Sequence, residues 1–127
     1  MKGITFIVLS VLLASCSSKI SSNIISQNKS LTIEDKVAFL DIQHLVPENV
    51  KKIGDARYQD TGFSTNCDLY TNLVSARKLA RQNGANIVKV IEKKTPDLWS
   101  SCYRIKVEFY YYEGDVTKLK QYQLQIN

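Results

Sequence analysis

Cysteine is the residue type with the widest chemistry in this chain, and it occurs at three positions, Cys16, Cys67 and Cys102. A cysteine thiolate can attack a substrate, bind a metal or form a disulfide. His44 is the only histidine, so a metal site built on several imidazoles is excluded. Phosphate-binding loops, the serine nucleophile motif and paired carboxylates are also missing from the sequence. We therefore expect no catalytic residue, no metal, no cofactor and no enzymatic activity.

The first cysteine ends a segment that is typical of a bacterial lipoprotein signal. Lys2 supplies a positive start, and a mainly apolar run follows over residues 4–14. Leu13-Ala14-Ser15-Cys16 then matches a lipobox, in which small residues precede a cysteine. The run is shorter than the ~20 residues of a lasting membrane helix, so we expect removal of residues 1–15 and lipidation of Cys16. The alternative is an ordinary secretory signal with a chance cysteine.

The other two cysteines would then form an even pair in an exported chain. Because oxidising compartments favour disulfides, this count predicts a bond between Cys67 and Cys102. The bond would close a loop of about 36 residues and stabilise the fold by ~3–4 kcal/mol in the chain-entropy model. Two alternatives remain, namely two free thiols or a redox pair, although the spacing differs from the C-x-x-C of thiol oxidoreductases.

The residue after the lipidated cysteine predicts which membrane carries the protein. In the enteric sorting rule, Asp at this position retains a lipoprotein in the inner membrane, whereas Ser permits transfer outward. Ser17 therefore predicts a lipid anchor in the outer membrane, with the chain facing the periplasm. The formal net charge of +5 fits anionic lipid head groups or an acidic partner, although solubility alone would also explain it. Nucleic-acid binding is not expected of an exported domain with this charge.

Composition and hydrophobic periodicity divide the chain after the signal of residues 1–15 into three further ranges. After the signal, residues 16–33 are rich in Ser and Asn and predict a flexible tether. Residues 34–114 predict one small α+β domain, and residues 115–127 a C-terminal tail that fits neither helical nor strand periodicity. The domain is expected to have the order β-β-α-β-β, with one helix packed on a mainly antiparallel sheet. Its expected strands are residues 37–42, 50–58, 87–91 and 102–112, and its expected helix is residues 68–83.

The helix is predicted by one apolar face at spacings of three and four residues. Asn66 or Asp68 is expected to cap its start, and Gly84 to end it in the left-handed conformation. In the last strand Arg104, Lys106 and Glu108 alternate with apolar residues, which predicts one buried and one polar face. The apolar face of the helix comprises Leu69, Leu73, Ala76 and Ala80.

Three surface features are candidates for partner binding. The first is a basic patch, the second is Trp99 in the loop over residues 95–101, and the third is the pair Tyr110 and Tyr112. Each has a purely structural alternative, which is respectively a solvated helix face, a ring folded over the disulfide and ordinary cross-strand aromatic pairing. His44 is expected in a loop without a functional role. The basic patch comprises Arg77, Lys78 and Arg81, extended by Lys89, Lys93 and Lys94.

Several of these segments together resemble the RcsF family of outer-membrane lipoproteins, which feed the Rcs envelope-stress phosphorelay. The resemblance covers roughly residues 50–112 and is carried by Cys67, by Ala76-Arg77-Lys78, by residues 84–88 (GANIV) and by Cys102-Tyr103-Arg104. It implies a helix held against a small sheet, with the Cys67–Cys102 bond joining the helix entrance to the last strand. The family's second disulfide and its proline-rich tether have no counterpart here.

The expected function is therefore that of an envelope-stress sensor or adaptor that works through contacts with an envelope protein. The runner-up is a small binding module for an envelope ligand such as lipopolysaccharide or peptidoglycan. A thiol-redox enzyme is a third hypothesis, since it would use the same two cysteines.

Overall fold

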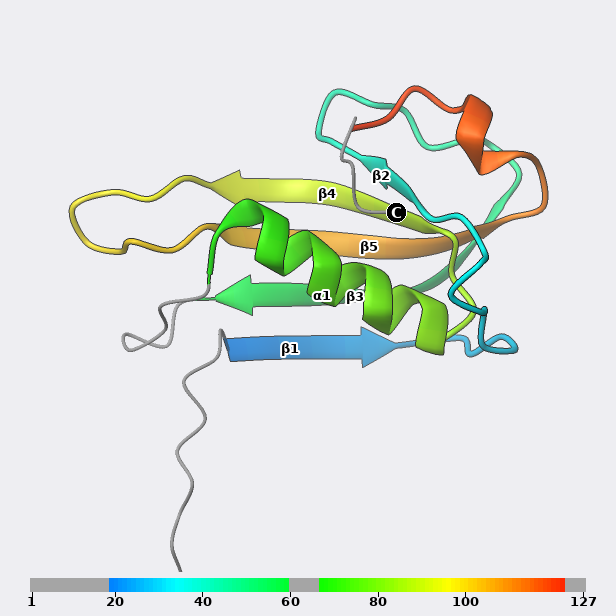
Figure 1. The fold of residues 1–127 in the computed structure, drawn as a ribbon, viewed down its shortest axis with the longest axis horizontal. Coiled ribbons are helices and arrows are strands. Elements are labelled where there is room, and N and C mark those ends of the chain that lie inside the picture. Colours follow the sequence, from blue (N-terminus) through cyan, green and yellow to red (C-terminus); the bar gives the residue numbers. More distant parts are fainter. Residues whose placement is uncertain (1–18, 60–66, 123–127) are drawn as a thin grey trace, which may run out of the picture.

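The computed structural model describes residues 19–59 and 67–122, and these form one helix packed on one sheet (Figure 1). The expected α+β class and the single small domain are confirmed. None of the helices in these two ranges is long and apolar enough to cross a membrane. The elements, in chain order, are β1 (Lys19–Ile24), β2 (Ala38–Leu40), β3 (Val50–Gln59), α1 (Leu69–Gln82), β4 (Ile87–Lys94), β5 (Arg104–Tyr112) and the 3-10 helix η1 (Val116–Lys118).

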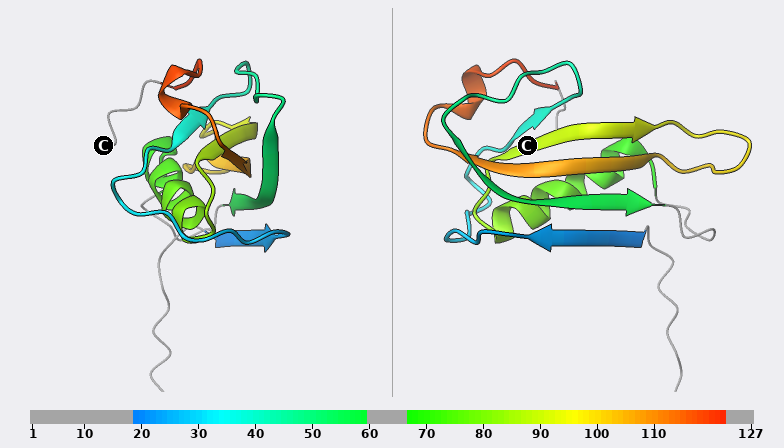
Figure 2. Two further views of the ribbon diagram at one scale, coloured as in Figure 1. Left: turned by 90° about the vertical axis from the view of Figure 1, so that its right-hand side faces the viewer. Right: turned by 180° about the vertical axis from the view of Figure 1, so that it is seen from behind.

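The sheet has the strand order β1-β3-β5-β4-β2. β2 runs parallel to β4, whereas every other neighbouring pair is antiparallel, as expected for a mainly antiparallel sheet. The helix α1 lies across one face of this sheet, and Figure 2 shows the same two layers from the side and from behind.

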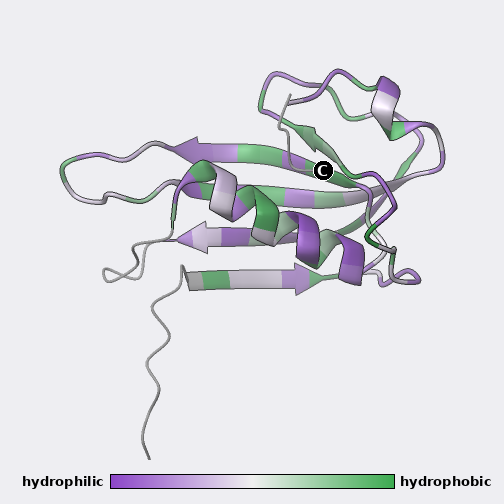
Figure 3. Cartoon of the chain, in the orientation of Figure 1, coloured by the Kyte–Doolittle hydropathy of each residue, from purple (hydrophilic) through white to green (hydrophobic). Residues whose placement is uncertain are grey.

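The main core lies between α1 and the sheet. Ile105, Val107 and Phe109 of β5 are almost fully buried there, as the alternation of that strand predicted. Leu73, Ala76 and Ala80 supply the buried face of α1, which confirms the predicted helix face. Figure 3 shows apolar and polar residues interleaved along the strands, as expected when only one face of a strand is buried.

A second, smaller cluster covers part of the opposite face of the sheet. It joins β2, β4 and η1 through the buried residues Ala38, Leu40, Ile87 and Val116. Part of the predicted C-terminal tail thus packs on the domain, since η1 supplies Val116 and the Tyr122 N–H donates to the Phe39 carbonyl at 2.7 Å. The part of this face over β3 and β5 that lies beyond the cluster carries charged side chains, among them Arg57 and Lys106.

The prediction of a flexible tether over residues 16–33 is wrong for residues 19–33. Residues 19–24 form β1, which pairs with β3 from Lys19 opposite Gln59 to Ile24 opposite Gly54. The polar composition of this segment did not prevent pairing, because a sheet ladder uses backbone groups that every residue carries. The order is therefore β-β-β-α-β-β, and the first strand was missed. Residues 16–18 of the predicted tether lie outside the described residues.

The segment after β1 closes the C-terminal end of α1. A helix leaves its last carbonyl groups without internal partners, and donors from elsewhere must satisfy them. Residues 28–31 provide such donors. The bonds are Asn28 N–H to the Asn83 carbonyl at 3.1 Å, the Ser30 hydroxyl to the Gln82 carbonyl at 2.7 Å, and Leu31 N–H to the Arg81 carbonyl at 2.8 Å.

Two glycines permit close approaches of the backbone to residues 23–29 of the N-terminal segment. Gly84 has φ +74° just after α1, which confirms the predicted left-handed cap. Gly54 lies at an irregularity between β3 and β5, where the register shifts between Lys52 and Gly54. A Cβ atom at Gly54 would lie 2.4 Å from the carbonyl oxygen of Asn23 in β1. Gly54 thus combines a bulge in β3 with a close backbone approach to β1.

Candidate functional site: the disulfide end and the open sheet face

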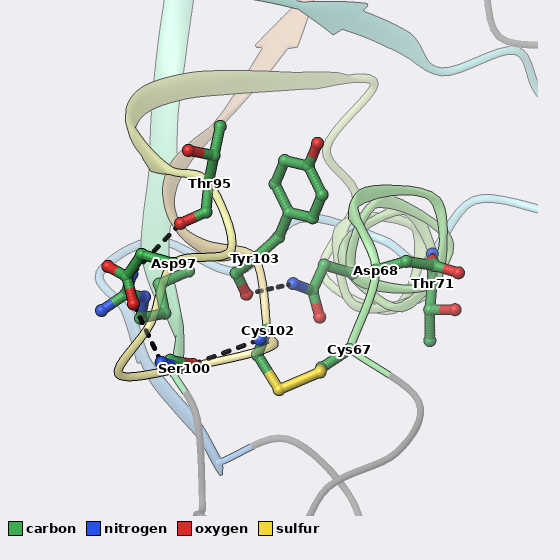
Figure 4. The surroundings of a disulfide bond; sticks show 10 residues. Cys67, Asp68, Thr71, Thr95, Asp97, Ser100, Cys102 and Tyr103 are labelled. Atoms are coloured by element: carbon green, nitrogen blue, oxygen red, sulfur yellow. Dashed lines mark hydrogen bonds and ion pairs between the residues drawn. A yellow bond between two sulfur atoms is a disulfide. The ribbon is translucent and has the colours of Figure 1, made fainter.

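Cys67 and Cys102 form a disulfide, with their Cα atoms 4.9 Å apart (Figure 4). The predicted bond is confirmed, and the alternative of two free thiols is wrong. Both cysteines are buried, which favours a structural bond over an exchanging redox pair. Two hydrogen bonds reinforce it, from Tyr103 N–H to the Cys67 carbonyl at 2.9 Å and from the Asn72 amide to the Tyr103 carbonyl at 3.0 Å. The start of α1 is thereby fixed to the start of β5.

The loop between β4 and β5, residues 95–103, is braced by Asp97. Its carboxylate accepts the backbone N–H groups of Trp99 and Ser100, each at 2.9 Å, and the Arg104 guanidinium, also at 2.9 Å. The hydrogen bond from Arg104 holds the pKa of the Asp97 carboxyl below its usual value, and the two backbone N–H groups act in the same direction. Asp97 also donates its own N–H to the Ser100 carbonyl at 2.8 Å. The loop therefore has a defined shape.

This braced loop presents two large apolar side chains to solvent. Trp99 is 93 % exposed and Leu98 is fully exposed. The alternative in which Trp99 folds back over the disulfide is therefore wrong. An exposed tryptophan on an ordered loop meets the description of an interface anchor, because little conformational entropy remains to be lost on binding.

A groove of about 370 Å³ lies over the part of the sheet that neither α1 nor the second cluster covers. We call this surface the open face, and we define it by Arg57, Glu92, Lys94, Arg104 and Lys106, with Trp99 at its rim. Strand register brings its charges together, because Arg57 pairs with Lys106 across β3 and β5 and Glu92 pairs with Lys106 across β4 and β5.

The open face carries more positive than negative charge. Arg57 pairs with Glu92 at 3.4 Å, and Arg104 pairs with Asp97 at 2.9 Å. Lys94 and Lys106 make no ion pair within residues 19–59 and 67–122. These two ammonium groups are available to an anionic partner. Sequence reasoning placed Arg104 and Lys106 on the polar side of their strand but did not single out Arg57 or Lys106 as site residues.

The predicted basic patch does not form one surface. Lys89 donates to the carbonyl groups of Asp41, Ile42 and His44, and burial lowers its pKa. Lys93 pairs with the Asp41 carboxylate at 3.2 Å and lies over the Tyr122 ring. Both lysines thus bind the segment that follows β2.

The helical part of that patch is also divided. Arg81 donates to the Asp35 carbonyl at 2.8 Å, and burial lowers its pKa. Arg77 is half-buried and Lys78 is exposed on the outer side of α1. Lys94 is therefore the one member of the predicted patch that contributes to the open face.

The remaining candidates have structural roles in the described chain. Tyr110 and Tyr112 are half-buried against the second cluster, and burial raises the pKa of Tyr110. Their cross-strand neighbours are Val50 for Tyr112 and Lys52 and Ile87 for Tyr110, so the aromatic pairing considered for them is not observed. His44 accepts the Asp41 N–H through Nδ1 at 2.9 Å and so closes a local turn.

Neither of the two described ranges contains a group of three or more His, Cys, Asp or Glu side chains that could hold a metal ion. The disulfide end and the open face together place a braced aromatic loop beside a cationic groove. No family model, no curated protein and no solved structure matches this chain.

Proposed function

We propose that the protein is an outer-membrane-anchored periplasmic lipoprotein that acts as an envelope-stress sensor or adaptor by binding a partner protein through the open face. The observation that carries this proposal is the groove over the sheet, where Lys94 and Lys106 accompany two arginines that are already held by ion pairs. Arginine and aromatic residues are enriched at the energetic centres of interfaces. The surplus of positive charge suits a partner with an acidic surface.

Two features of the sequence support the location and the class of function. The lipobox ending at Cys16 supports a lipid anchor, and the likeness to the RcsF family supports a sensor role. The same cations would also suit the phosphate groups of lipopolysaccharide, which is the second candidate function.

A photoreactive residue at position 106 tests the proposal in living cells. We expect a discrete crosslinked protein from this position and none from position 78, which is exposed on the outer side of α1 and serves as the matched control. Lys94→Glu should reduce the yield at position 106, because it reverses the cation without an ion-pair partner that remains when position 106 carries the photoreactive residue. Lipopolysaccharide as the crosslinked species would favour the second candidate. Equal yields from positions 106 and 78 would contradict a role of the open face.

The location is tested by replacing Ser17. Under the enteric sorting rule, Ser17→Asp is expected to move the protein from outer-membrane to inner-membrane fractions, and Ser17→Ala is the matched control that should not move it. The measurement is density-gradient fractionation with marker proteins for both membranes. Native protein that cosediments with the inner-membrane marker alone would refute the proposed location.

A further inference from the structure

The chain enters the domain at the same end of the sheet from which the β4–β5 loop projects. Lys19 pairs with Gln59, Tyr58 pairs with Ile105, and Lys94 pairs with Arg104. The first residue of β1 and the two ends of the loop therefore lie in one row across the sheet. Neighbouring strands are ~4.8 Å apart, so β1 is roughly 10 Å from β5. Figures 1 and 2 show the start of β1 and the β4–β5 loop at this common end.

A short stretch of sequence separates this end from the proposed lipid anchor. Ser17 and Ser18 alone lie between Cys16 and Lys19. Three residue steps span at most about 11 Å. Four steps take the chain from Lys94 to Leu98, which is at most about 14 Å. The length of the chain therefore allows the tip of the loop and Cys16 to reach the same surface.

The tip has the chemistry of a membrane-interface anchor. Leu98 and Trp99 are exposed side by side, and tryptophan prefers the boundary between lipid chains and head groups because its ring is apolar and its N–H is polar. Lys94 and Arg104 flank the base of the loop, where cations are attracted to anionic lipid head groups. The Asp97 contacts hold the tip in shape before it meets a surface.

We propose that the β4–β5 loop inserts Leu98 and Trp99 into the interfacial region of the leaflet that holds the Cys16 lipid. This inference rests on the proposed lipid anchor. Two attachments at one end, the lipid and the loop, fix the orientation of the domain. The strands then rise away from the membrane, and the open face is presented sideways to a partner at the membrane surface.

Trp99 is the only tryptophan of the chain, so the fluorescence of the protein reports directly on the β4–β5 loop. The acylated protein is placed in vesicles of phosphatidylethanolamine and phosphatidylglycerol, with or without bromine on the acyl chains. We expect a blue-shifted Trp99 emission that the brominated lipid quenches. Leu98→Asp should abolish the quenching while the lipid anchor remains. The double variant Trp99→Phe with Lys118→Trp moves the probe to exposed η1 at the other end of the sheet, and its emission should not be quenched.

The proposal is overturned if Trp99 is quenched no more than the probe at position 118. It is also overturned if Trp99 becomes protected from aqueous iodide when a partner protein is added but not when the vesicles alone are present. Failure of the lipid anchor is recognised separately, from the mass of the N-terminal peptide. Crosslinking at position 106, compared with and without Leu98→Asp, distinguishes failure of the loop from failure of the open face, because Leu98→Asp leaves Arg57, Lys94 and Arg104 in place.

Discussion

Replacing either Cys67 or Cys102 by serine is expected to lower the free energy of unfolding by ~3–4 kcal/mol. The bond closes a loop with a sequence separation of 35, and its loss returns that conformational entropy to the unfolded chain. Small domains have only about 5–15 kcal/mol of net stability, so this loss is a large fraction of it. Urea unfolding of the two variants and of the parent measures the difference.

The two single variants and the double variant should be equally destabilised, because either change breaks the same bond. Reducing the parent protein with dithiothreitol should give the same midpoint as the variants. Ser101→Ala, an exposed neighbour of Cys102, is the matched control and should leave the midpoint nearly unchanged. Additive losses in the double variant, or thiols that react with an alkylating reagent in the folded oxidised protein, would contradict the bond.

The elements predicted most closely are those whose hydrophobic periodicity shows which side is buried. β5 alternates apolar and polar residues from Arg104 to Phe109, and α1 repeats apolar residues at helical spacing, so both were predicted closely. The disulfide followed from counting cysteines in a chain expected to be exported. In each case the information lies either in the types of residues close together in the sequence or in the even number of cysteines that remain after lipidation.

The missed features depend on tertiary pairing. β1 has few apolar residues, and its place in the sheet comes from backbone bonds to β3 that no side-chain pattern encodes. The open face is assembled by register, because Arg57 and Lys106 are far apart in the chain and meet only across β3 and β5. The shift beside Gly54 also disturbs the alternation of β3, which hid the face on which Arg57 lies.

The basic patch failed for a related reason. Lys89 and Lys93 are close to the helix in sequence. The loop after β2 lies against them, however, and its carbonyl and carboxylate groups bind both ammonium groups. Whether a lysine is available to a partner depends on which loop covers it, and residues 41–44 are too remote in the sequence for that to be read. Trp99 could not be assigned as buried or exposed for the same reason, because the exposure of its ring depends on the contacts of Asp97 that shape the loop.

The packing of residues 28–31 on α1 makes Gly84 the position where the corrected N-terminal segment is most sharply tested. Gly84→Ala should cost about 2–5 kcal/mol, because the left-handed conformation penalises a Cβ by ~1–2 kcal/mol and overpacking adds ~1–3 kcal/mol. The new Cβ would lie 2.4 Å from the Asn28 Cβ and 2.6 Å from the Lys29 carbonyl oxygen. Urea unfolding measures the loss, and hydrogen exchange should show faster exchange of the Asn28 and Leu31 amides.

Gly114→Ala is the matched control for this prediction. The atoms nearest to its Cβ would belong to the outer part of the half-buried Tyr112 ring and not to backbone, and Gly114 does not have a positive φ. The control should therefore cost much less than Gly84→Ala and leave the exchange of Asn28 and Leu31 unchanged. If the two variants cost the same, residues 28–31 do not pack against α1. The segment would then be free to act as the flexible tether that its composition suggested, and the domain would no longer be held close to its lipid.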